Sequence, residues 1–262
     1  MKIERRYMAH YLNAGFGGDD DSKGTDAVKI SLMVNGLQSD VEYAEHEIET
    51  VHKPLLKRLQ TIKSASHHPR TIIFLSAPPG TGKSTLTCFW EWLARQDASL
   101  PDIQTLPMDG FHHYNRWLDD TGLRPFKGAP ETFDVEKLAQ NLRQIRQGAG
   151  FWPQYNRQKH DPEEAAITVT APVVIVEGNW LLLDEAPWRT LREFCDFSIF
   201  IKAPPEVLRQ RLINRKIAGG LSAEDAQAFY QRTDGPNVMR VLTHSLPADL
   251  TLEMTPEGGY RF

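Results

Sequence analysis

The sequence predicts an α/β fold with one main domain and a smaller N-terminal unit, and three observations lead to this prediction. The length of 262 residues suits a single sizeable core with an appendage. Residues 71–76 form a continuous apolar run, which is typical of a strand buried on both faces. Residues 84–95 then place apolar side chains at helical spacing, so a strand, a glycine-rich turn and a helix follow one another.

The composition limits the partners that the chain is suited to bind. Its 30 basic and 34 acidic residues give a net charge of −4, which argues against nucleic acid or a membrane surface as the main partner. Cys88 and Cys195 lack the spacing of a metal or redox site, which favours a reduced, cytoplasmic setting. Because no apolar run reaches the ~20 residues of a membrane span and no signal peptide is visible, we expect the protein to stay in the cytoplasm.

The first 67 residues are expected to form a separate N-terminal part. Residues 1–26 end in a polar, acidic run that predicts a mobile segment. Residues 27–67 are expected to be a hairpin followed by a helix. In the hairpin, apolar and polar residues alternate around Asn35-Gly36, a pair that suits a type I′ turn.

The helix of this unit is predicted over residues 44–62, with Pro54 near a break or restart. We expect the unit to brace the main sheet. Its two histidines, His46 and His52, are interpreted as surface residues and not as metal ligands.

A phosphate-binding loop is predicted at Ala77-Pro-Pro-Gly-Thr-Gly-Lys-Ser-Thr85, where Ala77 replaces the first glycine of the usual Gly-x-x-x-x-Gly-Lys-[Ser/Thr] pattern. Glycines in such a loop let backbone N–H groups point inward, and the following helix adds its positive dipole end. Lys83 would meet the terminal phosphates, and the Ser84 hydroxyl would be a ligand of Mg²⁺. The residues expected to bind the nucleotide are Pro79, Gly80, Thr81, Gly82, Lys83, Ser84 and Thr85. The alternative is an ordinary glycine-rich turn with a solvated lysine.

Asp109 follows the short apolar run 103–108, so it is expected at the carboxyl edge of a parallel sheet. There its carboxylate could accept the proton of an attacking hydroxyl. The alternative is that Asp109-Gly110 only makes a turn. His112 is a candidate substrate contact, while the adjacent pair His112 and His113 is poorly arranged to converge on a metal.

Two loops and a helix lie between this strand and the next one. Residues 124–134 are rich in turn formers and lead into a helix predicted over 135–147, with Asp134 as its cap. The polar stretch 153–161 is interpreted as a loop between regular elements. It carries Tyr155 and Arg157 as candidate substrate contacts, although such loops often have no binding role.

The next buried strand is predicted over residues 172–178 and ends in a carboxylate. Glu177 should therefore emerge beside the phosphate loop, where it could hold Mg²⁺ through water or orient the acceptor. Asn179 follows on the same edge and is a further candidate substrate contact. The alternative is a strand-end glutamate that faces solvent.

A strand over 197–201 and a helix beginning at Pro204 follow. Arg211 and Arg215 lie four residues apart on that helix, so both could neutralise charge on a migrating phosphoryl group, although a solvated charged face is the usual meaning of this spacing. Gly219-Gly220 suggests a hinge, and Asp234-Gly-Pro-Asn237 another turn. Residues 250–253 are expected to form the last strand.

Taken together, these motifs resemble the kinases related to uridine kinase, bacterial pantothenate kinase and phosphoribulokinase. The most specific segments are Met108-Asp-Gly-Phe111, Lys127-Gly-Ala-Pro-Glu-Thr-Phe-Asp134, Pro153-x-Tyr155 and Val176-Glu-Gly178. The resemblance spans about residues 68–254, and the preceding hairpin and helix resemble the extra N-terminal unit of one branch of that group.

This resemblance implies a P-loop three-layer sandwich with a five-stranded parallel sheet, and the use of ATP and Mg²⁺. It implies that Asp109 faces the acceptor hydroxyl, that Tyr155 lies near the substrate, and that Arg211 and Arg215 belong to a lid. One departure concerns the acceptor, because pantothenate kinases have Pro-x-Tyr-Ser-His where this chain has Pro153-Gln-Tyr-Asn-Arg157. Pantothenate is therefore in doubt, and an acceptor with an acidic or densely hydroxylated group is open.

We therefore expect a kinase that moves the γ-phosphoryl group of ATP to a hydroxyl of a small metabolite, such as a sugar, a nucleoside or a vitamin precursor. A P-loop ATPase or nucleotide-binding regulator that acts on a protein partner is the alternative. A homodimer is one assembly that the sequence allows.

Overall fold

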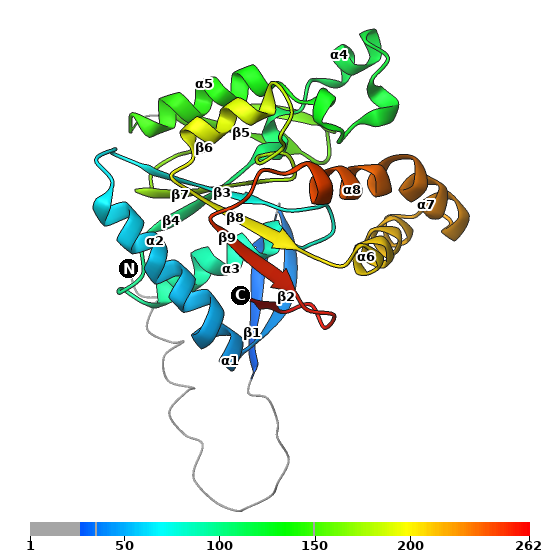
Figure 1. Cartoon of the computed structure of the whole chain (residues 1–262). Coiled ribbons are helices and arrows are strands. Elements are labelled where there is room, and N and C mark those ends of the chain that lie inside the picture. Colours follow the sequence, from blue (N-terminus) through cyan, green and yellow to red (C-terminus); the bar gives the residue numbers. More distant parts are fainter. Residues whose placement is uncertain (1–26, 35, 149) are drawn as a thin grey trace, which may run out of the picture.

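The computed structural model describes residues 27–34, 36–148 and 150–262. Its central sheet has six strands in the order β10-β9-β8-β3-β7-β4 (Figure 1). The strands are β3 (Thr71–Ser76), β4 (Ile103–Pro107), β7 (Val173–Gly178), β8 (Phe197–Lys202), β9 (Leu250–Met254) and β10 (Tyr260–Arg261). Five of them are parallel, and β10 pairs antiparallel with β9. The expected five-stranded parallel sheet is confirmed, but residues 250–253 are not the last strand, because the two-residue β10 follows.

Layers on both faces of the sheet make the fold a three-layer sandwich (Figure 1). One face is covered by α2 (Lys53–Ala65), α3 (Lys83–Gln96) and the hairpin β1 (Ala27–Val34) and β2 (Leu37–Ala44). The other is covered by α5 (Val135–Arg146), the 3-10 helix Trp188–Phe194 and the hairpin β5 (Phe151–Asn156) and β6 (Asp161–Thr168). Ile73 and Leu75 of β3 enter the first core, while Ile72 and Phe74 enter the second. Burial on both faces explains why the four central residues of this strand, 72–75, are all apolar.

The remaining helices are mostly short and lie between the strands. They are α1 (Glu45–Glu47), α4 (Asn115–Asp120), α6 (Pro205–Ala218), α7 (Ala223–Phe229) and α8 (Gly235–His244), with π-helical turns at Ile48–His52 and Tyr230–Asp234 and 3-10 turns at Met108–Phe111, Arg124–Phe126 and Pro130–Thr132. Within the described residues, no helix combines the length and apolar character that crossing a membrane requires.

The predicted cap of the helix after residue 134 is confirmed, and a second helix begins in a similar way. Asp134 caps α5, where its side chain accepts a hydrogen bond of 2.9 Å from the Lys137 amide. Ser222 caps α7 in the same way. The apolar face predicted for the helix after the phosphate loop is buried, and it consists of Leu86, Phe89, Trp90 and Leu93.

The N-terminal helix continues from residue 45 to residue 65 through a π-helical turn at Ile48–His52. Pro54 lies in the first turn of α2, directly after this turn. Proline has no N–H, and its ring clashes with the carbonyl four residues earlier, so a locally wider helix is a way to accept it. The predicted break at Pro54 is therefore a bulge in a continuous helix. Of the predicted Asn35-Gly36 turn, Asn35 lies outside the described residues, as does the segment 1–26.

His52 is fully buried, so its assignment to the surface is wrong, whereas His46 is exposed. The Trp90 Nε1–H donates to His52 Nδ1 over 3.1 Å, which leaves the proton on Nε2 to bond Glu47 Oε1 at 2.9 Å. Tyr43 completes the cluster by stacking on Phe89 with the ring centroids 3.9 Å apart. These contacts join the N-terminal unit to α3, the helix that follows the phosphate loop.

We expect His52→Ala to lower the free energy of unfolding by about 3 kcal/mol, because it leaves a cavity and removes the partner of the buried Trp90 indole. His46→Ala on the same helix is the matched control and should change it by less than about 0.5 kcal/mol. Urea unfolding of both variants measures the difference. Equal values would mean that the buried cluster does not stabilise this unit.

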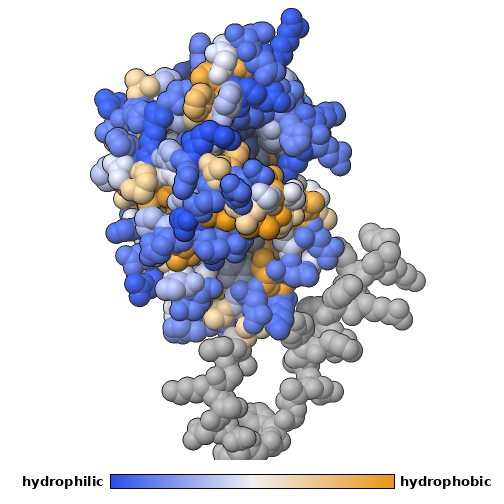
Figure 2. All heavy atoms as spheres, turned by 90° about the vertical axis from the view of Figure 1, so that its right-hand side faces the viewer, coloured by the Kyte–Doolittle hydropathy of each residue, from blue (hydrophilic) through white to orange (hydrophobic). Residues whose placement is uncertain are grey.

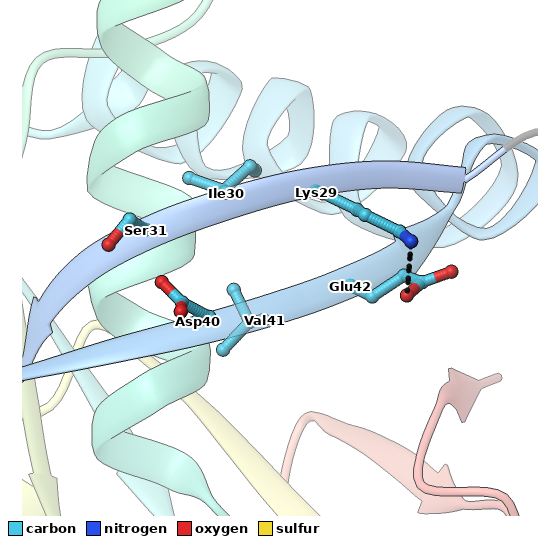
Figure 3. A pocket seen from close by; sticks show the side chains of 6 residues that line it. All are labelled: Lys29, Ile30, Ser31, Asp40, Val41 and Glu42. Atoms are coloured by element: carbon cyan, nitrogen blue, oxygen red, sulfur yellow. Dashed lines mark ion pairs between the residues drawn. The ribbon is translucent and has the colours of Figure 1, made fainter.

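The outer surface of the N-terminal hairpin carries a shallow hollow of about 450 Å³ (Figure 3). Lys29 and Glu42 approach to 3.7 Å across it, with side chains that are 78% and 57% exposed. An ion pair this exposed contributes little to stability. None of the residues that line this hollow lines the cleft at the phosphate loop.

Candidate active site

The phosphate loop joins β3 to α3 and has the backbone shape that a phosphate cradle needs. Gly80 and Gly82 have φ angles of +90° and +80°. A Cβ on Gly80 would also lie 3.1 Å from Leu212 Cγ, so a side chain has little room there. Gly82 caps α3 without a side-chain hydrogen bond, which leaves the first amides of α3 free to bind an anion. Ala77, the departure from the usual pattern, is buried in the core ahead of these glycines.

The loop is held from behind by the C-terminal strand. The Tyr260 hydroxyl donates to the Thr81 carbonyl oxygen over 2.9 Å, and the Tyr260 amide donates to Glu47 Oε1 over 3.0 Å. Glu47 is also the partner of His52. The N-terminal unit is therefore linked to the backbone of the phosphate loop through one tyrosine.

Four polar side chains meet where the phosphate loop faces the end of β7. Lys83 Nζ donates to Asn179 Oδ1 at 2.5 Å, and Ser84 Oγ donates to Glu177 Oε1 at 2.6 Å. Glu177 is only 5% exposed, and burial raises the pKa of its carboxyl, while the nearby Lys83 ammonium opposes this rise. Burial lowers the pKa of Lys83, and Glu177 and Asp109 oppose this effect. Parallel pairing of β3 with β7 brings the two ends together, because Ser76 lies beside Gly178 in the register.

The oxygens of Ser84 and Glu177 fit the donor set of a Mg²⁺ ion. A hydroxyl and a carboxylate are hard oxygen ligands, and Mg²⁺ in kinases uses one or two of these together with phosphate oxygens and water. Both side chains line the same cleft and lie within 2.6 Å of each other. The predicted metal residues therefore come together in the structure.

Asp109 lies in the 3-10 turn Met108–Phe111 that follows β4, the strand next to β7. It is exposed to the cleft, and no ion pair or side-chain hydrogen bond engages its carboxylate within the described chain. Gly110 is required beside it, because a Cβ there would lie 2.2 Å from the Pro153 carbonyl oxygen. The Asp-Gly pair thus makes a turn and also lets the β5–β6 hairpin pack against that turn.

A cleft of about 620 Å³ connects these groups, which is a usual size for a small-molecule site. Predicted residues that line it are Pro79, Gly80, Lys83, Ser84, Asp109, His112, Arg157, Glu177, Asn179 and Arg215. Predicted residues that do not line it are Thr81, Gly82, Thr85, Tyr155 and Arg211. The side of the molecule turned toward the viewer in Figure 2 is mostly hydrophilic, with smaller hydrophobic areas near its centre.

The stretch 153–161 was expected to be a loop between regular elements, and this interpretation is wrong. It forms part of the first strand and the turn of the β5–β6 hairpin. Arg157 in its turn lines the cleft. The Tyr155 ring lies behind this surface, 5.4 Å from the His112 ring and 4.9 Å from Lys127 Nζ. Tyr155 therefore supports two cleft residues and does not line the cleft itself.

The two adjacent histidines point to different partners. His112 stacks on Phe133 with the ring centroids 3.8 Å apart, and His113 stacks on Trp117 at 3.7 Å. Burial lowers the pKa of His112 to about 4, so this ring is neutral at neutral pH. His112 can exchange a hydrogen bond with a ligand, but it supplies no charge.

The helices α6 and α7 flank the cleft, and a turn at Gly219-Gly220 joins them. Arg215 lines the cleft, whereas Arg211 approaches the phosphate loop, with its Nη1 3.5 Å from the Gly80 carbonyl oxygen and 3.3 Å from Met254 Sδ. The two arginines share a helix but contact different parts of the site. Gly220 has a φ of +101°, as a residue that ends a helix often does.

Several cleft residues were not predicted from the sequence. They are Lys127, Gly128, Phe133, His160, Lys216, Leu221, Phe229, Asp234 and Asn237. Lys127 lies in the segment 127–134, which carries much of the resemblance to the kinase family, so its place in the cleft could have been predicted from that segment. Asp234 and Asn237 were hidden by a turn-like sequence, although Gly235 and Pro236 lie in the first turn of α8. Asp234 is 9% exposed, and its Oδ2 has no hydrogen-bond partner within the described residues.

Comparison with known proteins identifies relatives of this chain, and the matches include the residues of the cleft. Residues 72–243 match the model of the Phosphoribulokinase / Uridine kinase family. An Escherichia coli protein called uncharacterized protein YggC is 65% identical over 90% of this chain and 99% of its own. A pantothenate kinase from Bacillus velezensis is 28% identical over 78% of this chain and 72% of its own. A Silicibacter crystal structure, titled a "putative fructose transport system kinase", is 34% identical with a TM-score of 0.72, and the match covers 77% of this chain and 98% of that one.

Proposed function

Because this chain belongs to the phosphoribulokinase/uridine kinase family, we propose that it transfers the γ-phosphoryl group of ATP to a hydroxyl of a small metabolite. The observation that carries the proposal is the meeting of Lys83, Glu177 and Asp109 in one cleft. Lys83 belongs to the phosphate loop, while Asp109 belongs to a different strand end and has no side-chain partner in the described chain. In this proposal Lys83 supplies the positive charge that binds the phosphates, and Asp109 supplies the group that accepts the proton.

In the proposed reaction Asp109 accepts the proton of the acceptor hydroxyl, while the oxygen of that hydroxyl forms a bond to the γ-phosphorus. The bond from that phosphorus to the bridging β,γ-oxygen breaks, and its electron pair leaves with ADP. Lys83 and Arg215 neutralise charge on the phosphates. Ser84 and Glu177 would hold Mg²⁺, which would offset negative charge on the phosphates.

The helices α6 and α7 are suited to close over the transferred group. Arg215 and Lys216 line the cleft from α6, and Leu221 and Phe229 line it from the segment after the glycine turn. Closure would exclude water, which otherwise competes with the acceptor for the phosphoryl group. A kinase with this arrangement should therefore release little ADP until its acceptor is bound.

The experiment that tests the proposal is a screen of sugars, nucleosides and vitamin precursors for acceptor-dependent ADP release. We expect one chemical class to raise ADP release by about a hundredfold over the acceptor-free rate, because it completes the site. If the protein binds ATP but no acceptor changes its rate of ADP release, an ATPase or a nucleotide-binding regulator is favoured instead.

A further inference from the structure

A group of lysine, arginine and histidine side chains lines the cleft from elements that do not carry the phosphate loop. Lys127 comes from the loop between two 3-10 turns, and Arg157 and His160 come from the turn of the β5–β6 hairpin. The other lysines and arginines of the cleft are Lys83 on α3 and Arg215 and Lys216 on α6, and we assign these three to the nucleotide. Lys127 and Arg157 therefore remain on the acceptor side.

Lys127 is half-buried, and its ammonium is held by neutral groups. Its Nζ donates to Asn115 Oδ1 over 2.6 Å and to the His160 carbonyl oxygen over 2.8 Å, and lies 4.9 Å from the centre of the Tyr155 ring. No carboxylate forms an ion pair with it anywhere in the described chain. An ammonium has three N–H groups, so one is left for a ligand in the cleft.

Two other lysines near the hairpin form ion pairs with glutamates, whereas Lys127 forms none within the described chain. Lys137 forms an ion pair with Glu164, and Lys159 forms one with Glu163 at 2.6 Å. Burial lowers the pKa of the Lys127 ammonium, and Asp161 and Asp119 oppose this effect without forming an ion pair with it. A half-buried cation that has no direct ionic partner still loses part of its solvation. An acidic group of the substrate would supply that partner.

Arg157 adds a second cation from the same hairpin turn whose His160 carbonyl oxygen accepts the hydrogen bond of Lys127. It is exposed, lines the cleft and has no ion-pair partner within the described residues. Its positive charge opposes the rise in the pKa of both Tyr155 and Glu177, so both side chains are within its electrostatic reach. A guanidinium binds a carboxylate or a phosphate through two parallel hydrogen bonds.

The balance of charge in the cleft agrees with an anionic acceptor. Five lysines and arginines and three aspartates and glutamates line it. Asp234 interacts electrostatically with Lys216 and Arg215, and Glu177 interacts with Lys83. When the phosphate-loop and α6 cations are assigned to the nucleotide, Asp109 is the remaining carboxylate that lines the cleft with Lys127 and Arg157. A neutral acceptor would leave these two cations beside a single lining carboxylate.

We propose that the acceptor is a small hydroxylated anion, a carboxylate or a phosphate ester, whose acidic group binds Lys127 and Arg157 while its hydroxyl faces Asp109. This inference rests on the proposed kinase function and narrows its substrate class. Neutral nucleosides and neutral sugars are thereby excluded as the preferred acceptors.

Matched acceptor pairs test the inference through steady-state kinetics with ATP and Mg²⁺. The pairs are glycerate and glycerol, gluconate and glucitol, a sugar monophosphate and its sugar, and a nucleoside monophosphate and its nucleoside. We expect the anionic member of the productive pair to have a kcat/KM about 100-fold above its neutral partner. The carboxylate and phosphate pairs separate the two chemistries. A neutral member used equally well or better would overturn the inference and leave the kinase function standing.

Two substitutions locate the anion site. We expect Lys127→Gln and Arg157→Gln each to raise the KM for the anionic acceptor by about 10- to 100-fold and to reduce the preference over its neutral partner. Because Arg157 is exposed, its variant should fold normally even if Lys127→Gln does not. Lys159→Gln, on the same hairpin but outside the cleft, is the matched control and should stay within about twofold. An unchanged preference in both cleft variants would contradict the site.

A binding measurement separates this inference from the kinase function. With ADP and Mg²⁺ present, tartrate and glycerol phosphate are the anionic probes, and threitol and glycerol are the neutral ones. We expect at least one anionic probe to raise the melting temperature, the neutral probes to leave it unchanged, and Arg157→Gln to abolish the rise. If this pattern appeared without acceptor turnover, the anion site would stand and the transfer reaction would fail. No rise with either anion would overturn the anion site.

Discussion

Replacing Lys83 by alanine is expected to lower kcat for acceptor phosphorylation by about a thousandfold, because the variant loses a preorganised positive charge at the transferring phosphates. The Lys83 ammonium is positioned by Asn179 at 2.5 Å and lies beside the buried Glu177. Water cannot replace it at equal strength, since the cleft shields this end of β7 from solvent. A coupled assay of ADP formation at saturating acceptor measures the loss.

The structural effect of Lys83→Ala should be small. Lys83 is half-buried and makes one side-chain hydrogen bond, so the variant should retain its circular dichroism spectrum and cooperative unfolding. Lys57→Ala on α2 is the matched control, because Lys57 is exposed and outside the cleft, and it should keep full activity. If Lys83→Ala retained more than about a tenth of wild-type kcat, the phosphate-loop assignment would be wrong.

The central sheet could be predicted because its strands have a local signature. Residues 71–76 and 173–178 are buried on both faces, so every position is apolar or small until the strand reaches the site. The same strands lead into the cleft, since β3 runs into the phosphate loop and Glu177, next to the last residue of β7, lines the cleft. A polar residue at the end of an apolar run is visible in the sequence, and parallel pairing then brings those ends to one edge of the sheet.

Residues whose role depends on distant partners could not be predicted. His52 is buried because Trp90 and Glu47 satisfy both of its ring nitrogens, and neither contact follows from the amphipathic pattern of its own helix. Residues 153–161 resemble a loop in the sequence, yet Gln154, Tyr155 and Asn156 pair with β6 as part of a strand. Asp234 is the last residue of the π-helical turn Tyr230–Asp234, and such a turn is not visible in a turn-like sequence.

The second large effect is expected from Asp109→Asn, which removes the proton acceptor but keeps the shape of the side chain. We expect kcat with the true acceptor to fall by about a hundredfold to ten-thousandfold, the usual contribution of a general base. The affinity for ATP with Mg²⁺ should remain within about threefold, because Asp109 belongs to the end of β4 and not to the phosphate loop. Isothermal titration with a non-hydrolysable ATP analogue and steady-state kinetics separate the two quantities.

Asp102→Asn is the matched control for this experiment, since Asp102 is exposed just before the same strand and does not line the cleft. The comparison distinguishes the proposed roles in the site. Loss of both nucleotide affinity and turnover in Asp109→Asn would indicate that Asp109 organises the metal and phosphates, because Lys83 and Glu177 both respond to its charge. Unchanged turnover with the true acceptor would show that another group accepts the proton. Only a loss confined to turnover supports Asp109 as the residue that faces the acceptor hydroxyl.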